Sequence, residues 1–193
     1  VEGVFLNQGE VCCSGTRLFV EDKVHDALVE QLKHFAVKRK VGDPFNPATE
    51  QGAQNSKDQF DKILRYIDIG KKEARLVCGG RPAKVDGGKG YFIQPTVFDQ
   101  VRNDMKIARE EIFGPVLSVL RFQNVDELLA HANDTIFGLT AGIWTKDISK
   151  AHKLAKAVRA GTVWVNCYDC FDAASPFGGY KQSGFGRDLS HHC

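Results

Sequence analysis

Short β-rich segments alternate with amphipathic helical segments along the chain, and this alternation constrains the fold most. Apolar residues recur at helical spacing in four stretches, which begin near Val24, Ser56, Asn124 and Asp147. Between the stretches lie six β-rich runs: 17–20, 75–78, 91–98, 116–122, 139–145 and 162–166. Strands that alternate with helices typically form right-handed βαβ units. We therefore predict an α/β fold, a mainly parallel sheet with flanking helices.

The first helical stretch shows how the buried faces are predicted. Its apolar stripe consists of Val24, Leu28, Leu32, Phe35 and Ala36. The histidines of the predicted helices have polar neighbours, so we expect them on helix surfaces without a catalytic role. These histidines are His25, His34, His131 and His152.

Composition excludes several classes of protein. The 193 residues carry a net charge of only +2, without a long block of Lys or Arg, so no nucleic-acid partner is expected. No apolar run approaches the ~20 residues that span a bilayer, so no membrane partner is expected. Six cysteines in a chain of this size indicate reduced thiols. The prediction is a cytoplasmic location, with a mitochondrial one left open because the first residue is Val.

Cys12 is the first candidate catalytic residue, because it follows a glycine turn in FLNQGEVCCSGTR. A thiolate attacks carbonyl carbon when its pKa is lowered by a helix N-terminus or a nearby cation. Gly9 could let the backbone turn into a short helix at that point. The alternative is a simply buried Cys12-Cys13 pair.

The segment FLNQGEVCCSGTR resembles the cysteine signature of the NAD(P)-dependent aldehyde dehydrogenase superfamily. The core of that signature corresponds here to Gly9-Glu10-Val11-Cys12, with Glu10 where Gln is commoner. The resemblance implies that Cys12 is the catalytic nucleophile and that Cys13 is only its neighbour.

Two further segments carry the same resemblance. MKIAREEIFGPV is similar to the cofactor-binding segment of the family, which implies that Glu111 binds the ribose on the nicotinamide side and that Phe113 packs near the nicotinamide ring. Without that context, Glu110 and Glu111 would be a solvated pair before a core strand. The stretch from TVWVN to PFGGYKQSGFGR resembles the end of the family's catalytic domain, which implies that Phe171 and Phe177 line the aldehyde tunnel.

The resemblance also implies an activity for the parent enzyme. It would oxidise a small-molecule aldehyde to a carboxylic acid with NAD, NADP not being excluded, and it would be a homodimer or homotetramer. Residues 1–193 would be its catalytic domain, without the upstream dinucleotide-binding domain, the general base and the terminal oligomerisation segment. We expect little NAD-dependent turnover from these residues alone.

Three alternatives stay open from the sequence. The residues would form a non-catalytic interaction fragment, or a thiol esterase that uses Cys12 without a cofactor. The spacing of two cysteines and a terminal His-His-Cys also suggests a zinc or thiol-redox site, although it fits paired zinc-ligand clusters poorly, and we predict no metal. The residues concerned are Cys167, Cys170, His191, His192 and Cys193.

Overall fold

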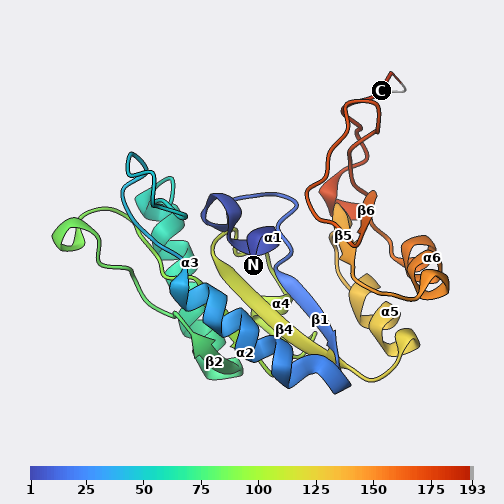
Figure 1. Cartoon of the computed structure of the whole chain (residues 1–193), viewed down its shortest axis with the longest axis horizontal. Coiled ribbons are helices and arrows are strands. Elements are labelled where there is room, and N and C mark those ends of the chain that lie inside the picture. Colours follow the sequence, from blue (N-terminus) through green and yellow to red (C-terminus); the bar gives the residue numbers. More distant parts are fainter. Residues whose placement is uncertain (192–193) are drawn as a thin grey trace. The chain divides into compact units, whose positions relative to one another are not determined.

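The computed structural model describes residues 1–191, which divide into two compact units (Figure 1). Unit 1 spans Val1–Gln123 and unit 2 spans Asn124–Cys193. Each unit combines parallel strands with helices.

Unit 1 is built on a four-stranded sheet in the order β1-β4-β3-β2. The strands are β1 (Arg17–Glu21), β2 (Arg75–Cys78), β3 (Thr96–Asp99) and β4 (Val116–Phe122). β4 pairs in parallel with both β1 and β3, whereas β2 is antiparallel to β3. A mainly parallel sheet results, with an antiparallel strand at one edge.

Two long helices cover the sheet of unit 1: α2 (Asp22–Lys38) and α3 (Lys57–Glu73). Side chains of β4 alternate between two apolar clusters, as the two-residue period of a strand requires. Leu117 and Val119 pack in the cluster of α2, whereas Val116 and Leu120 pack in the cluster of α3. The two helices therefore cover opposite faces.

Short helices complete unit 1. They are α1 (Glu2–Phe5), the 3₁₀ turn η1 (Leu6–Gly9), the 3₁₀ turn η2 (Asp86–Gly88) and α4 (Lys106–Arg109). Val4 and Phe5 of α1 are buried in the cluster of α2. This packing fixes the chain just before the segment that carries Cys12.

The buried face of α2 differs from the predicted stripe. Val24 and Phe35 are each 55% exposed, whereas His25 is fully buried together with Val29 of the next turn. His25 Nε2 lies 2.7 Å from Oδ1 of Asp99 at the end of β3. The surface position predicted for His25 was wrong because a distant carboxylate satisfies the ring inside the core.

Unit 2 contains two parallel strands, β5 (Thr140–Ile143) and β6 (Thr162–Val165). Its helices are α5 (Val125–Asn133) and α6 (Ile148–Ala157), and a 3₁₀ turn, η3, spans Lys181–Ser183. The side chains that precede the two helices cap them: Asn124 accepts a hydrogen bond from the amide of Glu127, and Asp147 from those of Ser149 and Lys150. With parallel pairing in both units, the predicted α/β class is confirmed.

Several strand ends differ from the sequence prediction, most of all in β3. β3 begins at Thr96, directly after Pro95, rather than at position 91. Proline lacks the amide that a strand ladder uses, which shortens the strand. β5 is also shorter than predicted, because it ends at Ile143 rather than at position 145.

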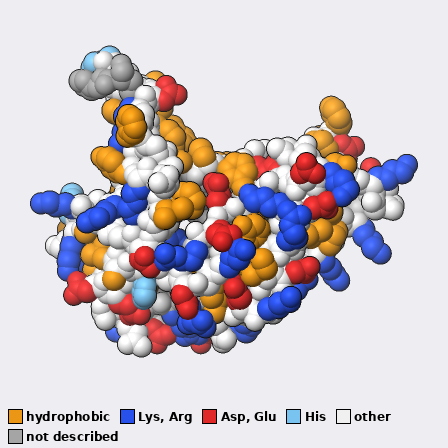
Figure 2. All heavy atoms as spheres, turned by 180° about the vertical axis from the view of Figure 1, so that it is seen from behind, with side chains coloured by type: hydrophobic (Ala, Val, Ile, Leu, Met, Phe, Trp, Pro, Cys, Tyr) orange, Lys and Arg blue, Asp and Glu red, His pale blue; other side chains and the backbone are white. Residues whose placement is uncertain are grey.

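The surface agrees with the near-balanced composition. On the face that Figure 2 shows, Lys and Arg side chains are interspersed with Asp and Glu side chains. Among residues 1–191, no helix has the length and apolarity needed to cross a membrane.

Candidate active site

Cys12 lies on an exposed turn of unit 1, between η1 and β1. Its thiol is free and exposed, whereas Cys13 is only 4% exposed. The Ser14 amide donates to the carbonyl of Val11 over 3.0 Å, and the Ser14 hydroxyl to the carbonyl of Val4 over 3.2 Å. The turn thus presents the first thiol of the pair to solvent and buries the second.

The expected helix start at Cys12 is absent. Residues 10–16 of the described chain form turn and irregular structure, and the short helices α1 and η1 precede the thiol. Gly9 ends η1 with a φ of +74° and so reverses the chain rather than starting a helix. A helix N-terminus therefore does not act on this sulfur.

Gly9 instead brings two candidate segments into contact. A Cβ at this position would lie 2.2 Å from the carbonyl oxygen of Gly114 and 2.7 Å from the nitrogen of Pro115. The backbones of the two segments therefore touch, which only glycine permits here. The loop that carries Cys12 and the segment that carries Glu111 and Phe113 are consequently neighbours within unit 1.

Glu10 ties the Cys12 loop to the start of α3. Its carboxylate accepts hydrogen bonds from Nε2 of Gln54 at 3.2 Å and from the amide of Asn55 at 3.3 Å. Nε2 of Gln8 donates to the same carboxylate over 3.3 Å. The residue directly before Val11-Cys12 therefore holds this loop in place.

Glu110 and Glu111 have different environments. The Tyr66 hydroxyl donates to Glu110 over 2.5 Å, and this hydrogen bond, with a smaller contribution from burial, raises the pKa of Tyr66 to about 12. The Glu111 side chain is exposed, and among residues 1–191 it makes no hydrogen bond or ion pair. Of the two carboxylates, Glu111 is the one available to a ligand.

Phe113 is half-buried and adopts a φ of +58°, a left-handed conformation that is uncommon for a bulky residue. Nε2 of Gln59 donates to the carbonyl of Phe113 and, over 3.3 Å, to that of Ile112. Because Gln59 lies in the first turn of α3, the same helix start that binds Glu10 also fixes Phe113. Gln59 was not predicted from the sequence, since nothing local marks its partner more than 50 residues away.

Phe171 and Phe177 meet in unit 2. Their ring centroids are 5.2 Å apart at an angle of 74°, an edge-to-face contact. The ring centroid of Phe171 lies 5.4 Å from that of Trp164, and the centroid of Trp164 lies 4.9 Å from that of Tyr168. Phe171 is 52% exposed, so this aromatic cluster presents one of its rings to solvent.

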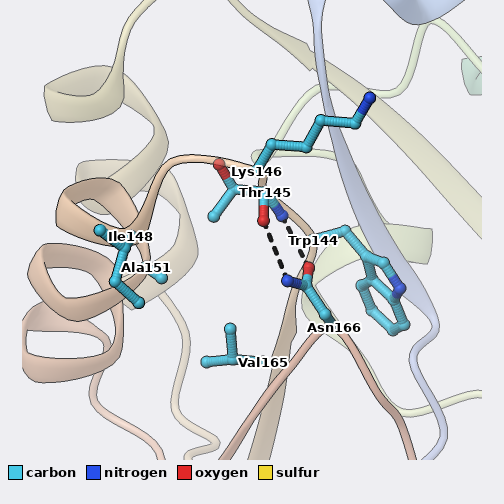
Figure 3. A pocket seen from close by; sticks show the side chains of 7 residues that line it. All are labelled: Trp144, Thr145, Lys146, Ile148, Ala151, Val165 and Asn166. Carbon is cyan, nitrogen blue, oxygen red and sulfur yellow. Dashed lines mark hydrogen bonds between the residues drawn. The ribbon is translucent and has the colours of Figure 1, made fainter.

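A separate hollow in unit 2 contains none of the predicted site residues (Figure 3). It lies where β5 and β6 end beside the start of α6, and the Asn166 amide bridges the backbone N and O of Thr145 at 2.9 and 3.0 Å. The lining is mostly apolar: Trp144, Thr145, Lys146, Ile148, Ala151, Val165 and Asn166.

The metal-binding alternative requires a set of arranged ligands, and the described part of the chain does not contain one. No group of three or more His, Cys, Asp or Glu side chains among residues 1–191 could hold a metal ion. Cys167 and Cys170 are free thiols. His192 and Cys193, the other two residues of the alternative zinc or thiol-redox site, lie outside the described residues.

Comparison with known proteins identifies the family. The profile of the aldehyde dehydrogenase family matches residues 1–193. The chain belongs to this family. The family resemblance stated from the three sequence segments is therefore confirmed.

Relatives of this aldehyde dehydrogenase chain are similar over nearly its full extent. The mitochondrial aldehyde dehydrogenase of Homo sapiens is 52% identical over 190 residues, which are 98% of this chain and 36% of that protein. The mitochondrial benzaldehyde dehydrogenase of Antirrhinum majus is 53% identical over 190 residues, 98% of this chain and 35% of that protein. The chain thus spans about a third of the length of the curated relatives it matches.

Solved structures agree with this assignment. The NAD+ complex of the aldehyde dehydrogenase from Bacillus cereus superimposes with a TM-score of 0.95 at 45% identity, covering 98% of this chain and 38% of that chain. The backbone of this chain therefore has the aldehyde dehydrogenase fold.

Proposed function

We propose that the protein carrying these residues oxidises aldehydes to carboxylic acids with NAD and that Cys12 is its nucleophile. The observation that carries the proposal is the exposed Cys12 thiol, on a loop that the Gly9–Gly114 contact places beside Glu111 and Phe113. A nucleophile must be both accessible and held in position, and this turn provides both.

Cys12 is the residue that forms a covalent bond with the substrate. Its thiolate attacks the carbonyl carbon of the aldehyde, and the Cys12 amide is a candidate donor to the oxyanion that develops. The sulfur then holds the acyl group until water releases it as the carboxylic acid. The buried Cys13 has no part in the reaction.

Glu111 and Phe113 fit the nicotinamide end of the cofactor. The carboxylate of Glu111 is exposed and free of partners among residues 1–191, so it can accept hydrogen bonds from adjacent ribose hydroxyls. The half-buried ring of Phe113 offers an apolar surface to a planar group. When bound, NAD supplies the acceptor for the two electrons that the aldehyde loses. NADP stays open, because neither residue would contact the adenosine ribose.

Phe171 and Phe177 are proposed to contact the aldehyde. Rings that meet edge to face, with one of them exposed, offer an apolar surface to an organic substrate. Residues 1–193 would supply the catalytic domain of an enzyme that forms homodimers or homotetramers. Its free cysteines fit a reducing compartment, the cytoplasm or the mitochondrial matrix.

Replacing Cys12 by alanine tests the nucleophile in the full-length protein. We expect Cys12→Ala to abolish NADH formation from a small aldehyde, by a factor of about 10³ or more, because no acyl-enzyme can form. Cys13→Ala is the matched control and should keep most of the activity. The measurement is NADH absorbance with each purified variant; unchanged turnover in Cys12→Ala would refute the assignment.

The same variants separate the two alternative functions. Hydrolysis of an activated ester without NAD, lost in Cys12→Ala, combined with no oxidation of any aldehyde, would favour the thiol esterase. No reaction with either substrate in the wild-type protein would favour the non-catalytic interaction fragment.

A further inference from the structure

The loop that follows β6 holds two cysteines in a tightly turned segment, Cys167-Tyr168-Asp169-Cys170. Asn166 and Asp169 both have a φ of +55°, in the left-handed region. The side-chain amide of Asn166 bonds to the backbone N–H and C=O of Thr145, which lies between β5 and α6 (Figure 3). The start of the loop is therefore anchored, and its turn at Asp169 bends the chain back.

The far end of the loop is anchored by Trp164. Its indole Nε1 donates to the carbonyl of Cys170 over 2.9 Å. The Tyr168 ring lies against Trp164 at 4.9 Å and stacks on Trp144 at 5.9 Å. Both cysteines therefore belong to a loop whose backbone is held by β6 and by its aromatic neighbours.

The two thiols belong to the same bent segment. Cys167 and Cys170 are three residues apart, and the Cys170 thiol folds back onto the loop, donating to the carbonyl of Tyr168 over 3.6 Å. Both thiols are free; Cys170 is exposed and Cys167 is partly buried. Desolvation, followed by the hydrogen bond with Cys170, raises the pKa of Cys167. Cys170 is therefore the thiol that a reagent in solution meets first.

We propose that Cys167 and Cys170 form a reversible thiol–disulfide pair that is oxidised by small-molecule disulfides. A bent segment that is anchored at both ends holds two free thiols three residues apart, which is the spacing of Cys-X-X-Cys redox pairs. Because the described residues near the pair supply no third metal ligand, the arrangement favours redox chemistry over zinc binding.

The reaction proceeds by two thiol–disulfide exchanges. The Cys170 thiolate attacks one sulfur of the external disulfide, breaks its S–S bond and releases one thiolate, which takes up a proton. The Cys167 thiol then loses its proton and attacks Sγ of Cys170, releasing the second external thiol. Two cysteine thiols are thereby oxidised to one disulfide, and one external disulfide is reduced to two thiols.

Formation of this disulfide would change the position of Phe171, the residue that follows Cys170. Phe171 packs against Trp164, the same side chain that binds the carbonyl of Cys170. Tightening the turn therefore displaces the exposed ring of the aromatic cluster. The effect on an aldehyde rests on the proposed function, whereas the disulfide itself does not.

Peptide mass spectrometry tests the pair in the full-length protein. We use the Cys12→Ala background, which removes the exposed thiol of unit 1, incubate it with oxidised glutathione and alkylate the remaining thiols. We expect the peptide with both cysteines to be two hydrogen atoms lighter, unalkylated, and restored by dithiothreitol. Full alkylation of both cysteines at every ratio of oxidised to reduced glutathione would overturn the proposal.

Single variants define the roles of the two sulfurs. Cys167→Ser should accumulate glutathione on Cys170, because the resolving thiol is absent, whereas Cys170→Ser should largely resist modification. Cys78→Ser, which removes a partly buried thiol on β2, is the control and should form the disulfide as before. A stable glutathione adduct on Cys170 with Cys167 intact would also overturn the proposal.

Kinetics with Cys12 present then test the effect on the substrate. Oxidation should change KM for the aldehyde by a factor of about three or more, and Cys170→Ser should abolish this change. The two measurements fail separately: an unchanged KM with the disulfide formed and Cys12 unmodified rejects the effect on Phe171, and absence of aldehyde turnover in the enzyme before oxidation rejects the proposed function.

Discussion

The two units hold their candidate residues by different means. In unit 1, the Cys12 loop and the 111–115 segment touch through backbone atoms, and hydrogen bonds from the start of α3 secure both. In unit 2, Phe171 and Phe177 are positioned by contacts between rings, one of which is half exposed. The first arrangement permits little adjustment, whereas the second can change shape through single side chains.

The distribution of buried side chains reinforces this difference. Both large apolar clusters lie in unit 1, on the two faces of its sheet. Among residues 124–191, the buried apolar side chains are Ile143, Ala151, Leu154 and Trp164. Substitutions should therefore cost more free energy of unfolding in unit 1 than in unit 2.

The largest effect is expected from Asp99, which is fully buried in unit 1. It binds His25 at 2.7 Å and Arg75 at 2.6 Å. Asp99→Ala leaves both partners without their acceptor and should lower the free energy of unfolding by about 3–5 kcal/mol in urea titrations. Asp104→Ala, which removes an exposed ion pair with Arg102, is the control and should leave the free energy of unfolding nearly unchanged.

This effect should depend on pH with a defined sign. Burial opposes ionisation of Asp99, but hydrogen bonds from Arg75, the Gln100 amide and His25 outweigh it and lower its pKa. The contribution of ionised Asp99 to the free energy of unfolding is thus complete above the ordinary carboxyl pKa of about 3.9, and it is lost as the pH falls through the lowered folded-state pKa. An Asp99→Ala deficit that grew on acidification would contradict this account.

A matched pair of glycines tests the backbone contact directly. Gly9 and Gly87 have φ angles of +74° and +71°, but a Cβ at Gly87 would meet nothing within 4 Å. Gly87→Ala should cost only the left-handed penalty of about 1–2 kcal/mol. Gly9→Ala should cost about 2–5 kcal/mol and reduce aldehyde turnover, because it also separates the two segments. Equal urea midpoints for the two variants would show that the contact is unimportant.

Helix caps provide a smaller effect, confined to unit 2. Asn124→Ala and Asp147→Ala each remove a side-chain acceptor at a helix start and should cost about 1 kcal/mol. Hydrogen exchange should accelerate at the amides of Glu127 and Ser149, respectively, while unit 1 keeps its protection. Asp126→Ala, which removes an exposed charge in the same turn, is the control.

Tyr66 gives the smallest expected change. Tyr66→Phe removes the hydrogen bond to Glu110 and should cost about 0.5–1.5 kcal/mol. The pKa of Tyr66 is raised to about 12 in the folded protein. The hydrogen bond therefore contributes fully to stability below the ordinary tyrosine pKa of about 10, and this contribution is lost as the pH rises toward the folded-state pKa. Phenolate absorbance should lose this late transition in Tyr66→Phe and show it at lower pH in Glu110→Gln.

Local signals explain what could be predicted from the sequence. The helix starts at Ser56, Asn124 and Asp147 were predictable because each cap binds amides within three residues. The burial of His25 was not, because its partner Asp99 is 74 residues away. The role of Gln59 likewise depends on a loop brought beside α3 by folding.

The candidate site divides in the same way. The motif around Cys12 identified the thiol, but only the fold shows which cysteine of the pair reaches solvent. The choice between Glu110 and Glu111 depended on the family resemblance, and Tyr66 supplies a physical reason for it. A side chain's neighbours decide such questions, and those neighbours come from distant parts of the chain.

Gly70 allows α3 to lie directly on the sheet. A Cβ there would come within 2.7 Å of the buried ring of Phe98, so any larger residue must lift this end of the helix. At the opposite end of this helix, Gln59 holds the carbonyl of Phe113, and the residues that lead into the helix, Gln54 and Asn55, bind Glu10. A methyl group added at Gly70, about three turns from Gln59, would therefore displace the helix and shift the Cys12 loop and the Phe113 segment together without touching either.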